Sequence, residues 1–196
     1  TAVMPVLMVG LLILVVMAPA FIFFSEKGPG AVHAFWAVSL IAGIVVGGLA
    51  QYTRLCMVGG IRDIILFQET KLLMGFVAVF VAAFLVNLAF GNFHPGFANQ
   101  PIAHTDGLWN FLGMALAGFC SILLGGCPMR QLIMTGEGNT DSAITVLGLV
   151  IGAAFAHNFG LAAGGNGPTF NGEVAVVLGF VVALIIAVVN TRKQGT

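Results

Sequence analysis

The chain has 196 residues, of which 59% are hydrophobic and only 7% are charged, and its formal net charge is zero. A soluble globular domain carries about 25% charged residues, so this composition excludes an ordinary soluble domain and points to the lipid bilayer. The balanced charge and the lack of a basic cluster argue against nucleic acid as a partner.

Apolar stretches long enough to cross a membrane recur along the chain, since a hydrocarbon core of about 30 Å needs about 20 residues of helix. In chain order the six stretches are 3–24, 31–52, 72–90, 108–124, 142–163 and 173–190. The first lacks the basic start of a signal peptide and is read as a span. Asp141 is the expected N-cap of the fifth. The sequence therefore predicts an all-α polytopic membrane protein with about six transmembrane helices.

Two further apolar segments, 56–67 and 127–135, are too short to span, and each begins at a cysteine. Glycines allow the backbone beside them to break and turn, and a proline suits the first turn of a new helix. The residues concerned are Gly59, Gly60, Gly125, Gly126 and Pro128. Broken backbone cannot face lipid, so it has to face protein or a water-filled cavity. We expect two short re-entrant or half helices around a polar pathway.

The organisation of the chain reads as a single transmembrane domain over residues 1–196, with a weak internal repeat between 31–90 and 108–163. Each repeat has a glycine-bearing span, a cysteine, a short helix with an arginine, and another span. Because the first residue is Thr1, we expect the chain to be processed, truncated or the C-terminal part of a longer polypeptide.

Lysine and arginine predict the orientation of the spans in the membrane. The connectors 91–107 and 164–172 contain neither residue, and Lys27 is the exception to the pattern. The basic residues at the opposite ends of the spans are Arg54, Arg62, Lys71, Arg130, Arg192 and Lys193. Both termini and the starts of both cysteine segments are therefore expected on the cytoplasmic side.

The three cysteines are too few for a disulfide framework, and their odd number leaves at least one thiol free. Cys127 lies where the N-cap of the second short helix is expected, beside N–H groups that suit a small anion. Its soft sulfur favours a sulfur or selenium species over phosphate. Cys120 lies seven residues earlier and shares a face with Cys127 if the helix continues. The alternative is that these cysteines only fill space.

The charged residues of the short helices allow two interpretations. Arg130 lies near a helix N-terminus, which disfavours a cation, so it should have an anionic partner: Glu137, Asp141 or the substrate. Arg62 and Asp63 are adjacent and point differently around a helix, so they need not pair and can be ordinary loop charges. The four histidines lack the spacing of a zinc motif with the cysteines, and no cofactor or metal is expected.

Segments 51–63 (QYTRLCMVGGIRD) and 124–132 (LGGCPMRQL) resemble the YeeE/YedE family of bacterial inner-membrane proteins. Segment 136–143 (GEGNTDSA) resembles its YedE branch, which is linked to selenium metabolism. The resemblance implies uptake of a small sulfur oxyanion, thiosulfate in the better-understood branch, or of a selenium compound. It also implies that the substrate passes between thiols through S–H···S hydrogen bonds, with Cys56 and Cys127 at the matching positions.

We therefore expect a transporter, and not an enzyme, that imports a small sulfur or selenium anion through a cysteine-lined pathway in the bacterial inner membrane. The candidate pathway residues are Cys56, Cys120, Cys127, Arg62, Arg130, Gly59, Gly60, Gly125, Gly126 and Pro128. One alternative is a membrane thiol redox carrier that uses Cys56 and Cys127 as a dithiol. Another is a membrane anchor for a cytoplasmic sulfurtransferase or selenium-handling partner. Thiosulfate, selenite, selenide and sulfide all remain candidate substrates.

Overall fold

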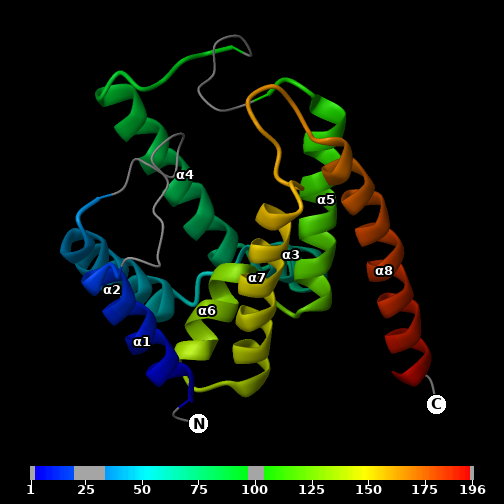
Figure 1. The fold of residues 1–196 in the computed structure, drawn as a ribbon, viewed down its shortest axis with the longest axis horizontal. Helices are drawn as coiled ribbons and strands as arrows, with labels where there is room; N and C mark the ends of the chain where they lie inside the picture. Colours follow the sequence, from blue (N-terminus) through cyan, green and yellow to red (C-terminus); the bar gives the residue numbers. More distant parts are fainter. Residues whose placement is uncertain (1–2, 20–33, 97–103, 195–196) are drawn as a thin grey trace. The chain divides into compact units, whose positions relative to one another are not determined.

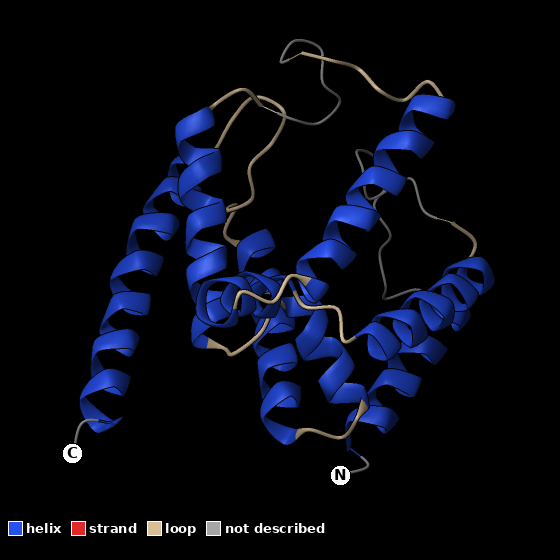
Figure 2. Cartoon of the chain, turned by 180° about the vertical axis from the view of Figure 1, so that it is seen from behind, coloured by secondary structure: helices blue, strands red, loops and turns tan. Residues whose placement is uncertain are grey.

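The computed structural model describes residues 3–19, 34–96 and 104–194 of the chain. Within these ranges the protein consists of α-helices and loops, with one isolated bridge between Gly164 and Gly167 and no strand (Figure 2). The eight helices of these ranges are α1 (Val3–Met17), α2 (Trp36–Thr53), α3 (Met57–Phe67), α4 (Lys71–Ala89), α5 (Gly107–Leu123), α6 (Pro128–Gly136), α7 (Thr140–Asn158) and α8 (Phe170–Gln194) (Figure 1). The predicted all-α class is confirmed.

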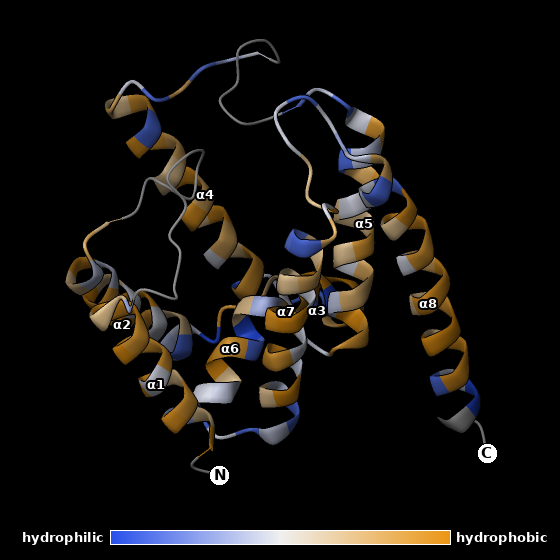
Figure 3. Ribbon diagram, viewed as in Figure 1, coloured by the Kyte–Doolittle hydropathy of each residue, from blue (hydrophilic) through white to orange (hydrophobic). Residues whose placement is uncertain are grey.

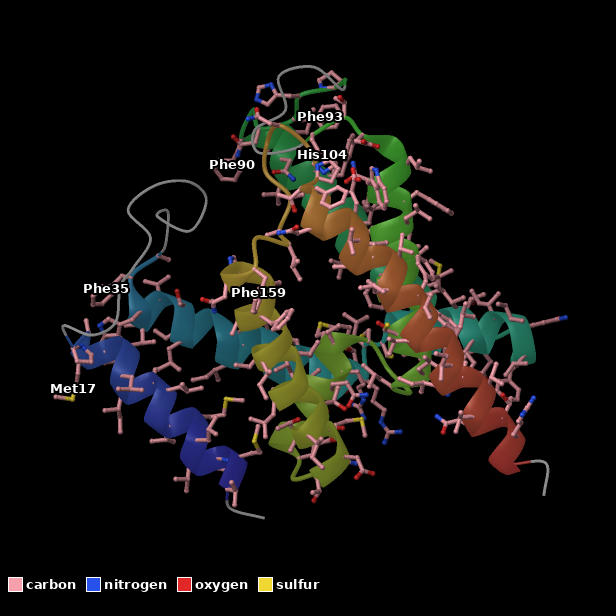
Figure 4. The ribbon with its side chains drawn as sticks, turned by 45° about the vertical axis from the view of Figure 1, so that its right-hand side comes forward. Met17, Phe35, Phe90, Phe93, His104 and Phe159 are labelled. Atoms are coloured by element: carbon pink, nitrogen blue, oxygen red, sulfur yellow. The ribbon has the colours of Figure 1, made fainter. Side chains whose placement is uncertain are left out.

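Five helical runs in the described residues are long and apolar enough to cross a membrane. They are Trp36–Phe67, Lys71–Ala89, Gly107–Gly136, Thr140–Asn158 and Phe170–Arg192. Hydrophobic residues dominate these helices along their length (Figure 3). Many of their large apolar side chains are exposed, as are Phe90 and Phe159 just beyond the ends of α4 and α7 (Figure 4). A helix that is apolar on all sides is stable only when it is surrounded by apolar material, so these helices belong in lipid. The protein is a multi-pass membrane protein.

The first predicted span is only partly described. Helix α1 has 15 residues and ends at Met17, which makes it shorter than a membrane span. The part of the predicted span 3–24 that follows residue 19 lies outside the described residues, as does the start of the span 31–52. Lys27, the exception to the charge pattern, also lies outside them.

Two of the five apolar runs are interrupted where the sequence predicts short helices. Helix α2 ends at Thr53 and α3 begins at Met57, while α5 ends at Leu123 and α6 begins at Pro128. The short helices predicted at 56–67 and 127–135 are thus present as α3 and α6, with bounds within one residue of those expected. Re-entrance into the membrane remains a prediction.

The start of α7 differs from the prediction that Asp141 caps it. The helix begins at Thr140, and the Asn139 side chain accepts a hydrogen bond of 3.0 Å from the backbone N–H of Ser142. Asn139 therefore caps the helix, and Asp141 lies in its first turn. The prediction was wrong by two positions, because asparagine is as good a cap as aspartate and the helix begins at Thr140 rather than at Ser142.

The chain forms two compact units, each described by itself. One comprises Thr1–Leu55 and Met129–Val146, and the other comprises Cys56–Pro128 and Leu147–Thr196. In the second unit α3 packs on α4, and α5 packs along α8 (Figure 1). The α5–α8 contact is close because Gly179 has no side chain: a Cβ there would lie 2.6 Å from Cδ2 of Leu116.

The turn between α7 and α8 is tied to itself by hydrogen bonds. The Thr169 hydroxyl donates to the Gly160 carbonyl at 2.7 Å, and the Asn171 amide donates to the Phe159 carbonyl at 3.1 Å. Gly164 and Gly167 exchange two backbone hydrogen bonds of 3.1 Å each. The turn therefore satisfies several of its polar groups internally, as a segment near the membrane has to do.

Candidate functional site

The backbone turns in the same way at both helix ends that precede a cysteine. After α2, Arg54 adopts the left-handed conformation, and the N–H groups of Arg54 and Leu55 donate to the carbonyls of Gln51 and Ala50. After α5, Gly125 is left-handed, and the N–H groups of Gly125 and Gly126 donate to Ile122 and Ser121. Both patterns are Schellman motifs, which end a helix and reverse the chain. In each case the cysteine follows the left-handed residue by two positions.

Cys56 is the N-cap of α3. Its backbone is extended, with φ −151° and ψ 114°, and its sulfur accepts a hydrogen bond of 3.3 Å from the backbone N–H of Gly59. The side chain thus satisfies one of the N–H groups that a helix start leaves without an intrahelical partner. Cys56 is buried. The sequence identified the cysteine as a pathway residue but not as a cap, because cysteine is not among the usual capping residues.

Gly59 and Gly60 bring the first turn of α3 close to the start of α4. The N–H of Gly60 donates to the carbonyl of Cys56 at 2.8 Å. A Cβ on Gly60 would lie 3.2 Å from the backbone nitrogen of Leu73, which is tighter than ordinary van der Waals contact. Both glycines are helical and buried, so neither marks a break in the chain, and Gly60 is the one that the close approach of α4 requires. The predicted break lies earlier, at Arg54.

Cys127 directly precedes Pro128, the first residue of α6. This is the place that the sequence predicted for it, since proline is preformed for the first helical turn. The thiol is half-buried and is not in a disulfide.

Cys56 and Cys127 are brought together within the second compact unit. The sulfur of Cys56 lies near the backbone N–H and the thiol of Cys127, close enough for both to act on it as hydrogen-bond donors. The N–H of Gly59 completes a set of donors around one sulfur. Two thiols in contact, each at the start of a short helix, form a site rich in soft sulfur and in N–H donors. Such a site can hold a small anion that has a polarizable atom.

Cys120 does not extend this pair along a common helix face. Helix α5 ends at Leu123, and the left-handed Gly125 turns the chain before Cys127 is reached. The shared face therefore does not form, because it required the helix to continue. Cys120 is a half-buried free thiol within α5, and its place in the pathway remains a prediction.

Arg130 lies in the first compact unit, in a polar cluster with Gln51 and Glu137. Its Nη2 atom is 3.9 Å from Oε2 of Glu137, and its Nη1 donates to Oε1 of Gln51 at 3.2 Å. The Gln51 amide in turn donates to Oε1 of Glu137. Of the anionic partners expected for Arg130, the structure selects Glu137. Sequence reasoning missed Gln51; its signal was an amide in the last turn of an apolar helix.

An open cavity of ≈ 420 Å³ adjoins this cluster. It is lined by Gly47, Gln51, Leu132, Ile133, Gly136 and Glu137. The two polar residues of the lining are members of the cluster, and all the lining residues belong to the same compact unit.

Arg62 pairs with its neighbour Asp63, an interaction that their adjacent positions on the helix left open. The Nη2 and Nε atoms of Arg62 donate to Oδ1 of Asp63 at 2.8 and 2.9 Å. The long arginine side chain bends back to reach the carboxylate, although neighbouring Cβ atoms diverge on a helix. The Arg62 side chain is 61% exposed, so this pair resembles an ordinary surface pair.

Among the described residues, no group of three or more histidine, cysteine, aspartate or glutamate side chains could hold a metal ion. Comparison with known protein families gives one match: a family model described as "Sulphur transport" covers residues 52–194, which include both cysteine segments. Neither the curated proteins nor the solved structures gave a significant match to the sequence.

Proposed function

The chain belongs to the sulphur transport family, and from this premise we propose that it imports a small sulfur- or selenium-containing anion through a pathway lined by Cys56 and Cys127. The family is the one to which the motifs in segments 51–63 and 124–132 were compared, and it indicates a transporter rather than an enzyme. The observation that carries the proposal is the contact between the two thiols.

The chemistry of the pair suits a relay without covalent steps. A thiol offers a weak S–H donor and a polarizable sulfur, so it can hold the soft sulfur of thiosulfate or a selenium atom. Because the two thiols are neighbours, an anion held by one can pass to the other over a short distance. The backbone N–H groups of Gly59 and Cys127, both near the sulfur of Cys56, offset part of the cost of removing water from the anion.

The helix order supports the proposed internal repeat within one transport domain. Helices α2, α3 and α4 have 18, 11 and 19 residues, and α5, α6 and α7 have 17, 9 and 19. In both series a Schellman motif precedes the cysteine, and a residue with positive φ follows the short helix within two positions, Gln68 after α3 and Gly138 after α6. We take the two cysteines as equivalent positions of a duplicated unit, and the left-handed Gly125 as the counterpart of Arg54.

Localisation and substrate follow from the same proposal. The protein would lie in the bacterial inner membrane with both termini on the cytoplasmic side, because the connector 164–172 carries no lysine or arginine. The substrate would be thiosulfate or, if the chain belongs to the selenium branch, a selenium compound. A cytoplasmic sulfurtransferase or selenium-handling protein would consume it.

The direct test is uptake into proteoliposomes that contain the full-length natural protein. Thiosulfate and selenite are supplied in parallel to the wild type, Cys56→Ala and Cys127→Ala. Each substitution should lower uptake by about tenfold or more, which corresponds to about 1.4 kcal/mol of lost interaction with the passing anion. Thr145→Ala, a half-buried position on α7 outside the two cysteine segments, is the matched control and should retain uptake.

Uptake that persists in a folded Cys127→Ala protein would contradict the cysteine pathway. A wild-type protein that is correctly inserted and imports neither anion would contradict the transport function itself. The species that the wild type prefers decides between the thiosulfate and selenium branches.

The contact between the two thiols also fits a thiol redox carrier, which is the second candidate. A carrier has to cycle through a Cys56–Cys127 disulfide, whereas the relay requires both thiols to remain free. Thiol trapping in growing cells distinguishes the two: a disulfide fraction that rises and falls with the redox state of the medium would favour the carrier. The anchor role is excluded if the purified protein transports without a partner.

A further inference from the structure

We propose that Arg130, Gln51 and Glu137 form a second anion site, in which the oxygen atoms of the substrate displace the Glu137 carboxylate from Arg130. The inference rests on the proposed function and deepens it, because it assigns a place for the oxyanion part of the substrate. It also narrows the substrate class to sulfur or selenium species that carry oxygens.

The cluster joins segments that lie far apart in the sequence. Gln51 is in the last turn of α2, whereas Arg130 and Glu137 lie on α6 and just after it. Gln51 contacts both charged residues, since its carbonyl oxygen accepts from Arg130 and its amide donates to Glu137. One neutral side chain thus holds a cation and an anion in a single arrangement with no net charge.

The ion pair inside this cluster is loose enough to be exchanged. Its closest contact, between Nη2 of Arg130 and Oε2 of Glu137, is 3.9 Å. A charge-assisted hydrogen bond of this type is normally about 2.7–2.9 Å long. The Glu137 side chain is 39% exposed, so it has room to turn away. The Glu137 carboxylate therefore lies beside the Arg130 guanidinium without a short hydrogen bond to it. An incoming anion would not have to break a strong bond to take its place.

The open cavity beside the cluster supplies space for the anion. Gln51 and Glu137 line it, and two glycines, Gly47 and Gly136, contribute no side chain to it. A Cβ added at either glycine would meet no other heavy atom within 4 Å. When an anion enters and Glu137 turns away, the Gln51 amide that now donates to the carboxylate can donate to the anion instead.

The chemistry of the two sites is complementary. A guanidinium recognises the oxygens of an oxyanion with two parallel N–H donors, which a thiol cannot do. The thiols of Cys56 and Cys127 suit a soft sulfur or selenium atom instead. Thiosulfate has a group for each site, whereas sulfide and selenide have no oxygen for Arg130 to bind.

The kinetic test measures the KM of radiolabelled thiosulfate uptake in proteoliposomes. Glu137→Gln removes the competing carboxylate and should lower KM by about two- to fivefold, the range expected for a partly exposed ion pair. Arg130→Gln removes the guanidinium and should raise KM by about tenfold or more. Glu69→Gln and Arg192→Gln remove the same charges from exposed positions outside the cluster and should leave KM unchanged.

A labelling experiment on the wild-type protein gives a readout that does not depend on how the variants fold. Phenylglyoxal modifies accessible arginines, and peptide mass spectrometry measures its extent at each one. Thiosulfate should protect Arg130 more than the other arginines, and sulfide at the same ionic strength should not protect it.

The outcomes separate this inference from the function on which it rests. If the wild type takes up thiosulfate but KM is the same in Glu137→Gln and Arg130→Gln, the second anion site is wrong and the transport function stands. Unprotected Arg130 in a transporting protein would also overturn the site. If the wild type imports no anion, the proposed function itself fails.

Discussion

Two adjacent glycines beside Cys56 have different surroundings, although the sequence gives them the same appearance. A Cβ on Gly59 would lie 3.4 Å from Cβ of Cys56 and 3.5 Å from Cδ1 of Leu72, which is ordinary contact. A Cβ on Gly60 would lie 3.2 Å from the backbone nitrogen of Leu73. A side chain can move aside from a new methyl group, but the backbone at the start of α4 cannot do so cheaply. Only Gly60 is therefore required for packing.

The substitutions Gly59→Ala and Gly60→Ala should differ in their effect on stability. Gly60→Ala should lower the free energy of unfolding by about 1–3 kcal/mol, the usual cost of overpacking. Gly59→Ala should change it by less than about 1 kcal/mol, because alanine also favours the helix. Thermal unfolding of the purified proteins in detergent measures the difference. Equal midpoints for the two variants would show that the α3–α4 contact is looser than the structure indicates.

At the scale of helices, the two turns before the cysteines are built from different residues. The left-handed position is Arg54 after α2, with φ 52°, and Gly125 after α5, with φ 75°. A residue with a side chain pays about 1–2 kcal/mol in this conformation, whereas glycine adopts it freely. Glycine also loses more entropy on folding, which offsets part of that advantage. The turns after α2 and α5 thus have the same backbone form but differ in the conformational free energy that their left-handed residue costs.

This difference predicts an asymmetry between two reciprocal substitutions. Gly125→Ala should destabilise the protein by about 1–2 kcal/mol, because it introduces a Cβ at positive φ. Arg54→Gly should be within about 1 kcal/mol of the wild type, because relief of strain and loss of chain entropy nearly cancel. Gly118→Ala, in the middle of α5 with no other heavy atom within 4 Å of its Cβ, controls for a methyl group in an open position. A Gly125→Ala protein as stable as this control would contradict the argument.

For the whole molecule, the arrangement of apolar runs and basic residues predicts which loops face the cytoplasm. Green fluorescent protein folds only in the cytoplasm, and alkaline phosphatase is active only outside it. A fluorescent fusion after residue 196 should therefore be bright, and a phosphatase fusion within 164–172 should be active. Reversed activities at both positions would show that the arginines of the short helices are functional rather than topogenic.

Local breakers made the short helices predictable. Gly125 and Pro128 fix the end of α5 and the start of α6, and the predicted and observed bounds of α6 agree within one residue. At α3 the turn came from Arg54, a residue that carries no breaker signal, and the prediction succeeded because the cysteine motif and the apolar run agreed. The positions of these helices could be predicted because the residues that begin and end each helix lie within a few positions of each other in the chain.

Long-range contacts could not be predicted in the same way. Nothing near Gln51 in the sequence indicates that its amide would meet Arg130 and Glu137, since those residues follow 79 and 86 positions later. The proximity of Cys56 and Cys127 was expected only from the resemblance to a known family, and not from their positions in the sequence. Sequence reasoning left the pairing of Arg62 with Asp63 open for the opposite reason: a rule for helix faces ignores how far an arginine side chain can bend.

The turn between α7 and α8 has a mechanical consequence for any transport cycle. Thr169 and Asn171 are each bonded back to the end of α7, and Gly164 and Gly167 bond to each other. Each such bond contributes about 0.5–1.5 kcal/mol net, so opening the whole turn would be a rare event. We therefore expect the turn to keep its conformation during transport and not to open and close over the pathway. If transport requires alternating access, we expect the movement to come from helices rather than from the opening of this turn.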